Sequence, residues 1–348
     1  MKANTKPKPR NSARMPVWLP YLQSLDEKSG IFTFTYKGGK VETDLSDVQS
    51  IMIYGDVDTP LSIHYIDKIT RKGIPIIIHR RTMAQAVYIV GSNRPDPDDT
   101  LSAQIRVRDN LHKRKHIVRQ LLEAKFHNMK WLVEEPPKLN SGMAIEAMRQ
   151  TEAQHSREYW KRYFILLGKP DWARRQQNPY AQALDASSKF ISGIVLRWAH
   201  YHHLSAFHGF LHEMTEYPTL VYDLMEPYRG TFDRLLFETL RNTPGEDNVR
   251  ITGACINALK DAMDEKVYTG LTRQIVTRQE LLHGIILSLK YYLLGKQSRF
   301  LIPTETRPNG GRPPKVMFRL YGRQAGRTDF WDRAREAARN TPLPAPSK

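Results

Sequence analysis

A short segment rich in proline and aspartate, residues 93–99 (NRPDPDD), divides the sequence into two parts with different hydrophobic patterns. Such a composition disfavours both helix and strand and is typical of a linker. Before it, apolar residues form short β-branched and aromatic runs, whereas after it they recur every three or four positions. The pattern predicts an α+β protein, with an N-terminal β-rich domain followed by a larger, mainly α-helical domain. We expect a basic tail over 1–14, the β-rich domain over 15–92, the linker over 93–100, the helical domain over 101–300 and a basic Pro/Gly-rich tail over 301–348.

The part before the linker carries strand and turn signals. Residues 31–36 (IFTFTY) and 51–54 (IMIY) are typical of strands, and the KGGK segment after the first is typical of a hairpin turn. Thr59-Pro60 resembles a helix N-cap and first turn, and Gly73 a helix end. We therefore expect a helix over 59–73, a buried strand over 74–79 and another strand near 87–90.

The chain is strongly basic, with 53 Lys and Arg against 36 Asp and Glu. Residues 1–14 supply five of the 17 excess charges, so most of the excess lies on folded structure. A nucleic-acid partner explains such an excess, whereas a membrane partner would need a long apolar span or an amphipathic basic helix, and neither is evident. The N-terminus lacks the apolar core of a signal peptide, so we expect a cytoplasmic protein. The single cysteine, Cys255, allows no internal disulfide or thiolate metal cage and is interpreted as a small core residue.

The predicted first long helix, from Leu101, is rich in basic residues. It has Asp109 and Glu123 against eight cations: Arg106, Arg108, Lys113, Arg114, Lys115, Arg119, Lys125 and Lys130. One interpretation is that it lies along a phosphate backbone, with Arg106, Lys113, Arg114 and Lys115 as contacts. The alternative is a solvated face on a helix that packs through Leu111, Val118, Leu121 and Leu122. The tail after Leu301 is expected to be irregular, or ordered only on DNA.

Glu152 is a candidate site residue because it lies on an apolar stripe. A helix predicted from near Ser141 places it on the same face as Ile145, Met148, His155, Tyr159 and Tyr163. A buried carboxylate requires a partner, for which Arg157, Lys161 or a metal ion are candidates. An ion pair with a neighbouring helix remains the alternative.

Residues 199–213 (AHYHHLSAFHGFLHE) contain five histidines. On a helix, His208 and His212 would be spaced to hold one metal ion, as in zinc hydrolases. That motif requires a glutamate directly after the first histidine, and this chain has Gly209 there. We therefore expect only one of these imidazoles to bind metal and the others to be structural or to face phosphate.

Residues 217–229 (YPTLVYDLMEPYR) place two acids, Asp223 and Glu226, on one face of a helix predicted to begin at Pro218. Acids at this spacing repel unless a cation lies between them, and a divalent ion is one such cation. Pro227 ends or kinks the helix beside Glu226 and leaves the carbonyl of Asp223 without its usual donor. The alternative is an exposed helix end with solvated acids.

Together these motifs resemble the CRISPR-associated protein one family, the universal integrases of CRISPR adaptation. Glu152 is followed at the family's offsets by Arg157, Tyr159 and Trp160, and a Gly-Phe-Leu-His run covers residues 209–212. The most specific match covers residues 218–229 (PTLVYDLMEPYR). A looser likeness extends over about residues 15–300. Residues 181–188 (AQALDASS), His155, Ser156 and the basic extensions depart from the family's usual pattern, which leaves the subtype, partner and DNA specificity open.

The resemblance implies a metal site formed by Glu152, His212 and Glu226, which would also be the catalytic residues, with Asp223 as an auxiliary acid. Two carboxylates and one imidazole suit Mg²⁺ or Mn²⁺. The implied activity is insertion of prespacer DNA into a CRISPR array by attack of a 3′-hydroxyl on a phosphodiester, with endonuclease capability. Arg157 and Arg229 would hold phosphates, and the implied partners are DNA, a second copy of the chain and the small ferredoxin-like second adaptation protein. The alternatives are a metal-dependent nuclease, a transposon-type integrase or a non-catalytic nucleic-acid scaffold.

Overall fold

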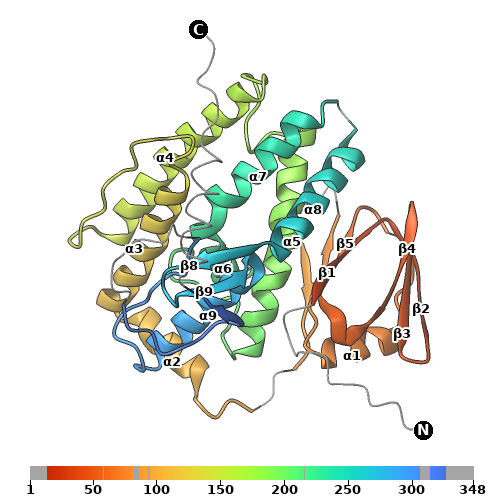
Figure 1. The fold of residues 1–348 in the computed structure, drawn as a ribbon, viewed down its shortest axis with the longest axis horizontal. Helices are drawn as coiled ribbons and strands as arrows, with labels where there is room; N and C mark the ends of the chain where they lie inside the picture. The colour runs from red at the N-terminus through yellow and green to blue at the C-terminus, as the bar shows by residue number, and fades with distance from the viewer. Residues whose placement is uncertain are drawn as a thin grey trace.

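The structure is a computed structural model of the 348-residue chain and describes residues 14–57, 59–80, 86–92, 95–214, 216–245, 247–305 and 314–326. A β-rich N-terminal part lies beside a larger helical part (Figure 1). The predicted fold class is confirmed. The exact domain boundaries stay predictions.

The N-terminal part contains two sheets. In the first, β1 (Met15–Pro20), β5 (Val48–Tyr54) and β6 (Ile76–His79) are parallel, and β7 (Val87–Ile89) is antiparallel at the edge. The second is an antiparallel meander of β2 (Leu22–Lys28), β3 (Ile31–Tyr36) and β4 (Gly39–Asp44), followed by the short helix η1 (Leu45–Asp47). The predicted hairpin turn is present, because Gly38 joins β3 and β4 with a φ of +102° that favours glycine.

The predicted N-terminal helix begins later than expected. Helix α1 spans Ile63–Arg71, with Ser62 as its N-cap, so Thr59-Pro60 lies outside it. The hydroxyl of Thr59 instead donates to the carbonyls of Leu22 and Gln23. Gly73 does follow the helix end, with a φ of +69°.

The helical part forms around α5, most of which is buried. Its helices are α2 (Thr100–Asp109), α3 (Leu111–Asn128), α4 (Ile145–Leu166), α5 (Pro179–Tyr201), α6 (Thr219–Met225), η2 (Glu226–Tyr228), α7 (Arg229–Asn242), α8 (Asn248–Asp264) and α9 (Arg278–Leu293). A small antiparallel sheet of β8 (Lys266–Thr269), β9 (Gln274–Thr277) and β10 (Gly322–Gln324) completes it. No helix in the described part of the chain is long and apolar enough to span a membrane.

The predicted first long helix is two helices, α2 and α3. Asn110 separates them with an extended backbone, and its side chain accepts from the amide of Lys113 to cap α3. Val118, Leu121 and Leu122 are buried as predicted, but Leu111 is 60% exposed. Helix α4 begins at Ile145 rather than near Ser141, and its predicted apolar stripe is buried.

Helix α5 joins the two parts of the molecule. The guanidinium of Arg197, which is buried, donates to the carbonyls of Val48 (2.6 Å) and Gln49 (3.0 Å) in β5. Burial lowers the pKa of Arg197 to about 9. Five donors on one planar group make arginine suited to bind two adjacent carbonyls, so this contact fixes β5 against α5.

The prediction of an irregular C-terminal tail is partly wrong. Phe318 and Leu320 are buried in the helical core, and Gly322–Gln324 add the edge strand β10 to β9. The rest of the predicted tail, like residues 1–13, lies largely outside the described residues. Cys255 is buried and free, as predicted, and burial raises its pKa to about 12, so its thiol is inert.

Candidate active site

Three separate stretches of the chain bring acids and a histidine together. Glu152 comes from α4, and Asp223 and Glu226 from α6 and η2. His212 lies on the irregular segment between α5 and α6. Asn128, at the end of α3, ties this region together because its amide donates to the carbonyl of Pro227 at 2.5 Å.

Asp223 is fully buried and holds the His212 loop, residues 209–213, by its amides. Its carboxylate accepts from the amides of Phe210 (2.6 Å), Leu211 (2.9 Å) and His212 (3.2 Å), and from Nδ1 of His212 (2.6 Å). A carboxylate with this many donors is satisfied without a metal ion. Asp223 is therefore a positioning acid.

Gly209 allows the His212 loop to wrap closely around that carboxylate. A Cβ at this position would lie 2.7 Å from Oδ2 of Asp223 and 2.8 Å from the carbonyl of His212. Oδ2 of Asp223 cannot move without breaking its hydrogen bonds to the amides of Phe210 and Leu211. The residue that excludes a zinc-hydrolase motif in the sequence thus has a steric reason to be glycine.

Three arginines from three helices hold the carbonyl side of the same loop. Arg108 of α2 donates to Gly209 (3.0 Å), Arg114 of α3 to Phe210 (2.8 Å) and Arg149 of α4 to Leu211 (2.8 Å). Arg114 and Arg149 also pair with Glu213. We refer to Arg108, Arg114 and Arg149 as the arginine clamp. The loop is therefore bonded on both its amide and its carbonyl sides, which fixes the position of His212.

The hydrogen bond from Asp223 determines which nitrogen of His212 is available. Because the carboxylate accepts from Nδ1, Nε2 of the neutral ring keeps its lone pair. Burial opposes protonation of His212, but the hydrogen bond and charge of Asp223, with Glu226, raise its pKa. An imidazole oriented by a carboxylate in this way is the usual form of a metal ligand.

Lys125 lies between the two glutamates. Its ammonium contacts Oε1 of Glu152 and lies 2.6 Å from Oε2 of Glu226, although its side chain is only 7% exposed. Burial would lower the pKa of Lys125, but Glu226 and Glu152 outweigh it and raise the pKa. Ser156 also donates to Oε1 of Glu152 at 2.7 Å.

Within the described residues, no group of three or more His, Cys, Asp and Glu side chains is placed to hold a metal ion as the side chains stand.

The residues nevertheless fit a hard divalent cation in their chemistry. Oε2 of Glu226 is buried and, apart from the Lys125 ammonium 2.6 Å away, has no hydrogen-bond partner among the described residues. Burial raises the pKa of Glu226, but Lys125, Arg229 and His212 lower it to about 2 and keep it ionised. Two ionised carboxylates and an imidazole nitrogen are a donor set that Mg²⁺ and Mn²⁺ accept.

A family model for CRISPR associated protein Cas1 matches residues 21–270 of the sequence. The chain belongs to the Cas1 family. No curated protein sequence matches this Cas1 chain significantly. The match includes every acid and histidine of the site described above.

Solved structures share the fold of this Cas1 chain. A CAS1 protein from Thermotoga maritima is similar with a TM-score of 0.67 and 19% identity, over 82% of this chain and 98% of that one. A casposase bound to integration product has a TM-score of 0.69 and 16% identity, over 82% of this chain and 92% of that one. A chain of a Cas6-RT-Cas1–Cas2 complex has a TM-score of 0.66 and 12% identity, over 85% of this chain and 37% of that one.

The partners predicted for Glu152 from its own helix are wrong. Arg157 and Lys161 are exposed on α4, and Glu152 pairs with Lys125 and Ser156 instead. Asp223 and Glu226 do not share one cation either, because Asp223 faces the His212 loop and Glu226 faces Lys125.

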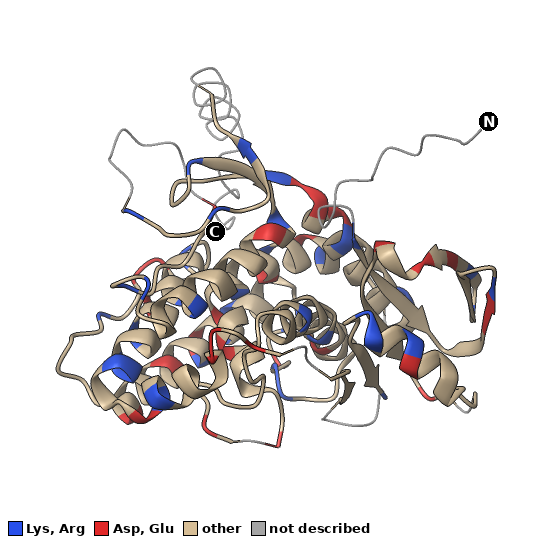
Figure 2. Cartoon of the chain, turned by 90° about the horizontal axis from the view of Figure 1, so that it is seen from below, with Lys and Arg blue, Asp and Glu red and all other residues tan. Residues whose placement is uncertain are grey.

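The predicted phosphate contacts fall into two groups. Arg106, Lys113 and Arg157 are exposed and Lys115 is half-buried, so phosphate contact stays a prediction for them. Arg114 is largely buried, and its guanidinium binds the carbonyl of Phe210 and pairs with Glu213. Figure 2 shows basic segments on both parts of the molecule, interspersed with acidic ones.

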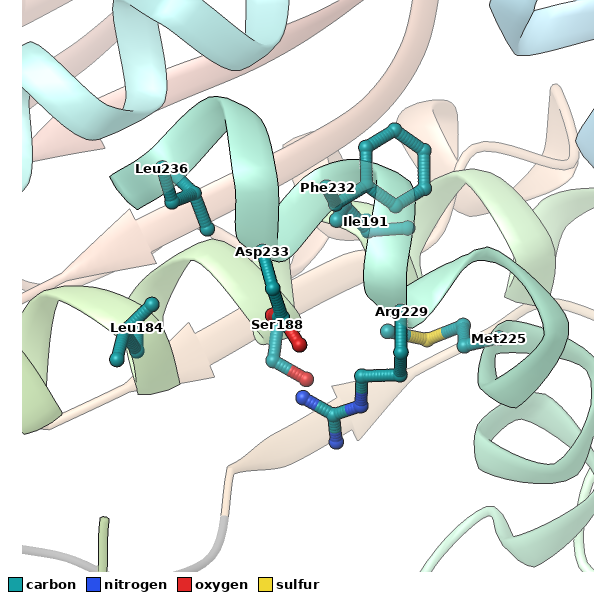
Figure 3. A pocket seen from close by; sticks show the side chains of 8 residues that line it. All are labelled: Leu184, Ser188, Ile191, Met225, Arg229, Phe232, Asp233 and Leu236. Carbon is teal, nitrogen blue, oxygen red and sulfur yellow. The ribbon is translucent and has the colours of Figure 1, made fainter. Parts of the chain in front are cut away.

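Arg229, the other predicted phosphate contact, is directed into the protein. Its Nε lies 3.6 Å from Oε1 of Glu226, and Figure 3 shows its guanidinium pointing toward Ser188 and Asp233. These groups line a cavity of about 20 Å³, which has room for no more than a water-sized molecule. Arg229 thus acts as a counterion of Glu226 from behind, and phosphate binding by it stays a prediction.

His208 and His212 do not share a helix, because α5 ends at Tyr201. Nδ1 of His208 bonds the hydroxyl of Ser205 at 2.7 Å, and Nε2 of His202 lies 2.8 Å from Nε2 of His283. His155 is buried against Phe126, and neither ring nitrogen has a hydrogen-bond partner among the described residues. Of these histidines, only His212 is bonded to a site acid.

Lys125 is the site residue that sequence reasoning missed, since the prediction placed it among solvated or phosphate-facing cations. A signal was present: Lys125 follows Leu121 by four positions and Leu122 by three, so it lies on the buried stripe of α3. A lysine at such a position requires an acidic partner. The sequence does not reveal that the partners are Glu152 and Glu226.

Proposed function

We propose that this Cas1 family member is a metal-dependent DNA integrase that joins the 3′ end of prespacer DNA to a CRISPR array. The observation that supports this most is the convergence of Glu152, Glu226 and His212 from three distant stretches, with Asp223 orienting the imidazole. We propose these three as the catalytic metal ligands, for Mg²⁺ or Mn²⁺.

The proposed reaction replaces one phosphodiester by another, so no nucleotide fuel is needed. The 3′-hydroxyl oxygen of the prespacer bonds to the target phosphorus and loses its proton to solvent, and the original 3′-oxygen leaves and takes up a proton from solvent. A bound divalent ion would stabilise the negative charge that develops on the phosphate oxygens. Glu152 and Glu226 supply carboxylate oxygens, Asp223 holds His212 in the tautomer that leaves Nε2 free, and the arginine clamp fixes the loop.

The proposed partners are DNA, a second copy of this chain and a Cas2 protein. The large positive charge supports a DNA partner, since phosphate neutralisation drives such binding. The fold shared with a chain from a Cas1–Cas2 complex supports the protein partner, and the fold shared with a casposase bound to integration product supports strand joining.

Analysis of the DNA product tests this function. Prespacer DNA with free 3′ ends is incubated with a repeat-containing plasmid in Mn²⁺ or EDTA, with the wild type, Glu226→Gln and Glu158→Gln. Glu158 is an exposed acid of α4 that pairs with Arg162 and serves as the matched control. We expect joined strands with the wild type and the control in Mn²⁺, and a loss of roughly 100-fold or more with Glu226→Gln.

Other outcomes separate the alternatives. Shortened strands without any joined product indicate a nuclease that uses water. Joining by Glu226→Gln at the wild-type rate shows that the proposed site is wrong. DNA binding without any reaction by the wild type supports a non-catalytic scaffold.

A further inference from the structure

We propose that Lys125 is a built-in substitute for the metal ion: it holds Glu152 and Glu226 together in the metal-free protein, and a divalent cation binds by displacing it. This inference rests on the metal site proposed above. It concerns how that site is kept folded when empty and what happens to the lysine when the site is filled.

The position of Lys125 is the first support. Its ammonium contacts one oxygen from each glutamate, Oε1 of Glu152 and Oε2 of Glu226, which come from α4 and η2. Two ionised carboxylates brought this close repel strongly in a buried setting unless a cation lies between them. A divalent ion bound by both glutamates would require the same place between these oxygens, so lysine and metal cannot both occupy it.

The partners and charges of the two glutamates also support displacement of the lysine. Apart from Lys125, 2.6 Å away, Oε2 of Glu226 has no hydrogen-bond partner among the described residues. Glu152 keeps a second donor, Ser156, that does not depend on Lys125. A doubly charged ion, which needs no directional bond, can therefore replace the singly charged ammonium with a gain in attraction.

The charge balance gives the displacement a consequence for DNA. Lys125 and Arg229 balance Glu152 and Glu226, so the four side chains together are neutral. Adding a divalent cation while the lysine stays nearby makes the cluster doubly positive. A cluster of that charge attracts a phosphate, so the displaced ammonium is available to a DNA phosphate only when metal is bound.

The chain offers a control lysine in the turn that follows the same helix. Lys130 follows Lys125 by five residues and is exposed. The experiment compares the wild type, Lys125→Met, Lys125→Arg and Lys130→Met without DNA. Mn²⁺ affinity is measured by loss of the free-ion electron paramagnetic resonance signal, and thermal midpoints are measured in EDTA and in Mn²⁺.

We expect Lys125→Met to bind Mn²⁺ at least about tenfold more tightly than the wild type, because the competitor is gone. In EDTA its thermal midpoint falls below that of the wild type, and Mn²⁺ raises it more. Lys125→Arg and Lys130→Met remain closer to the wild type in both measurements. Equal or weaker Mn²⁺ binding by folded Lys125→Met overturns the proposal.

A second measurement uses only the wild-type protein and so does not depend on the folding of a variant. Lysine acetylation is followed by mass spectrometry in EDTA and in saturating Mn²⁺. We expect the reactivity of Lys125 to rise severalfold with Mn²⁺ while that of Lys130 stays constant. Unchanged reactivity in a protein that demonstrably binds Mn²⁺ overturns displacement alone, whereas absence of Mn²⁺ binding overturns the proposed metal site together with it.

Discussion

The two halves of the site are stabilised in different ways. In the loop half, Asp223 accepts from three amides and an imidazole, and three arginines bind the carbonyls of residues 209–211. In the helix half, Lys125 lies between Glu152 and Glu226, Ser156 also donates to Glu152, and Arg229 lies 3.6 Å from Glu226. The loop half is thus complete by itself, while Asp233, buried behind the helix half, has an oxygen without a hydrogen-bond partner among the described residues. This difference predicts that Asp223 and Asp233 have opposite effects on stability.

The largest expected effect is in the loop half. Asp223→Asn leaves a single amide oxygen for four donors, so it should lower the free energy of unfolding by about 3–5 kcal/mol. It should also displace His212 and abolish strand joining. Urea unfolding monitored by circular dichroism measures the first effect. Asp67→Asn, in an exposed pair with Arg71, is the control and should change stability by less than about 1 kcal/mol. A tolerated Asp223→Asn would mean that the loop does not depend on this carboxylate.

The next expected effect is a gain in stability, on removal of the Asp233 carboxylate. Asp233, behind the helix half, is 3% exposed, and one of its oxygens has no hydrogen-bond partner among the described residues. Burial raises its pKa to about 6, against an ordinary value of 3.8. The folded protein therefore binds this proton more tightly than the unfolded chain, so stability is lost as the pH rises from about 4 to about 6.

Asp233→Asn removes this penalty and should raise the free energy of unfolding at pH 7.5 by about 2–3 kcal/mol. The gain should shrink as the pH falls from 6 to 4, where the wild-type carboxyl becomes protonated. Unfolding midpoints over this pH range provide the measurement. A variant that is less stable than the wild type at pH 7.5 would show that Asp233 is compensated by Arg229, and the contrast between the halves would weaken.

A smaller effect is expected from the arginine clamp. Arg149→Met removes the donor to the carbonyl of Leu211 and should destabilise the protein by about 1.5–3 kcal/mol, as for other bonds to a charged group. Because this change leaves Glu152 and Glu226 in place, Mn²⁺ affinity should fall only through misplacement of His212. Arg162→Met, from an exposed pair on the same helix, is the control. Equal stability of the two variants would remove the clamp from the account.

The smallest effect tests Ser156 in the helix half. Ser156→Ala removes the hydroxyl donor to Glu152 and should cost about 1 kcal/mol of stability. Lys125 still holds Glu152, so strand joining should persist. Joining that stops in this variant would show that Ser156 has a larger role than a second donor.

Local patterns predict the elements of this fold well. The apolar stripe of α4, the strand-rich start and the hairpin at Gly38 depend on neighbours in the sequence, and they are present. The break at Asn110 was missed because the apolar spacing continues across it. Only the structure shows that the Asn110 side chain accepts from the amide of Lys113 and so starts a new helix. The burial of Phe318 and Leu320 was missed because it depends on contacts with distant elements.

The candidate site shows the same limit. Spacing alone suggests that Asp223 and Glu226 share a cation, yet the two carboxylates face different neighbours. Family resemblance singled out Glu152 and His212, but neither resemblance nor pattern placed Lys125, Arg108 or Arg149 at the site, and Arg114 was predicted to contact phosphate. Their partners lie 27 to 101 residues away in the chain, so only the packed structure brings these pairs into view.

The location of bound Mn²⁺ tests the central claim most directly. A crystal of the protein grown with Mn²⁺ would be measured by anomalous diffraction at the manganese edge. We predict a peak bounded by carboxylate oxygens of Glu152 and Glu226 and by Nε2 of His212, with the Lys125 ammonium moved from between the glutamates. A peak elsewhere, or no peak while Lys125 keeps both glutamates, would contradict the account.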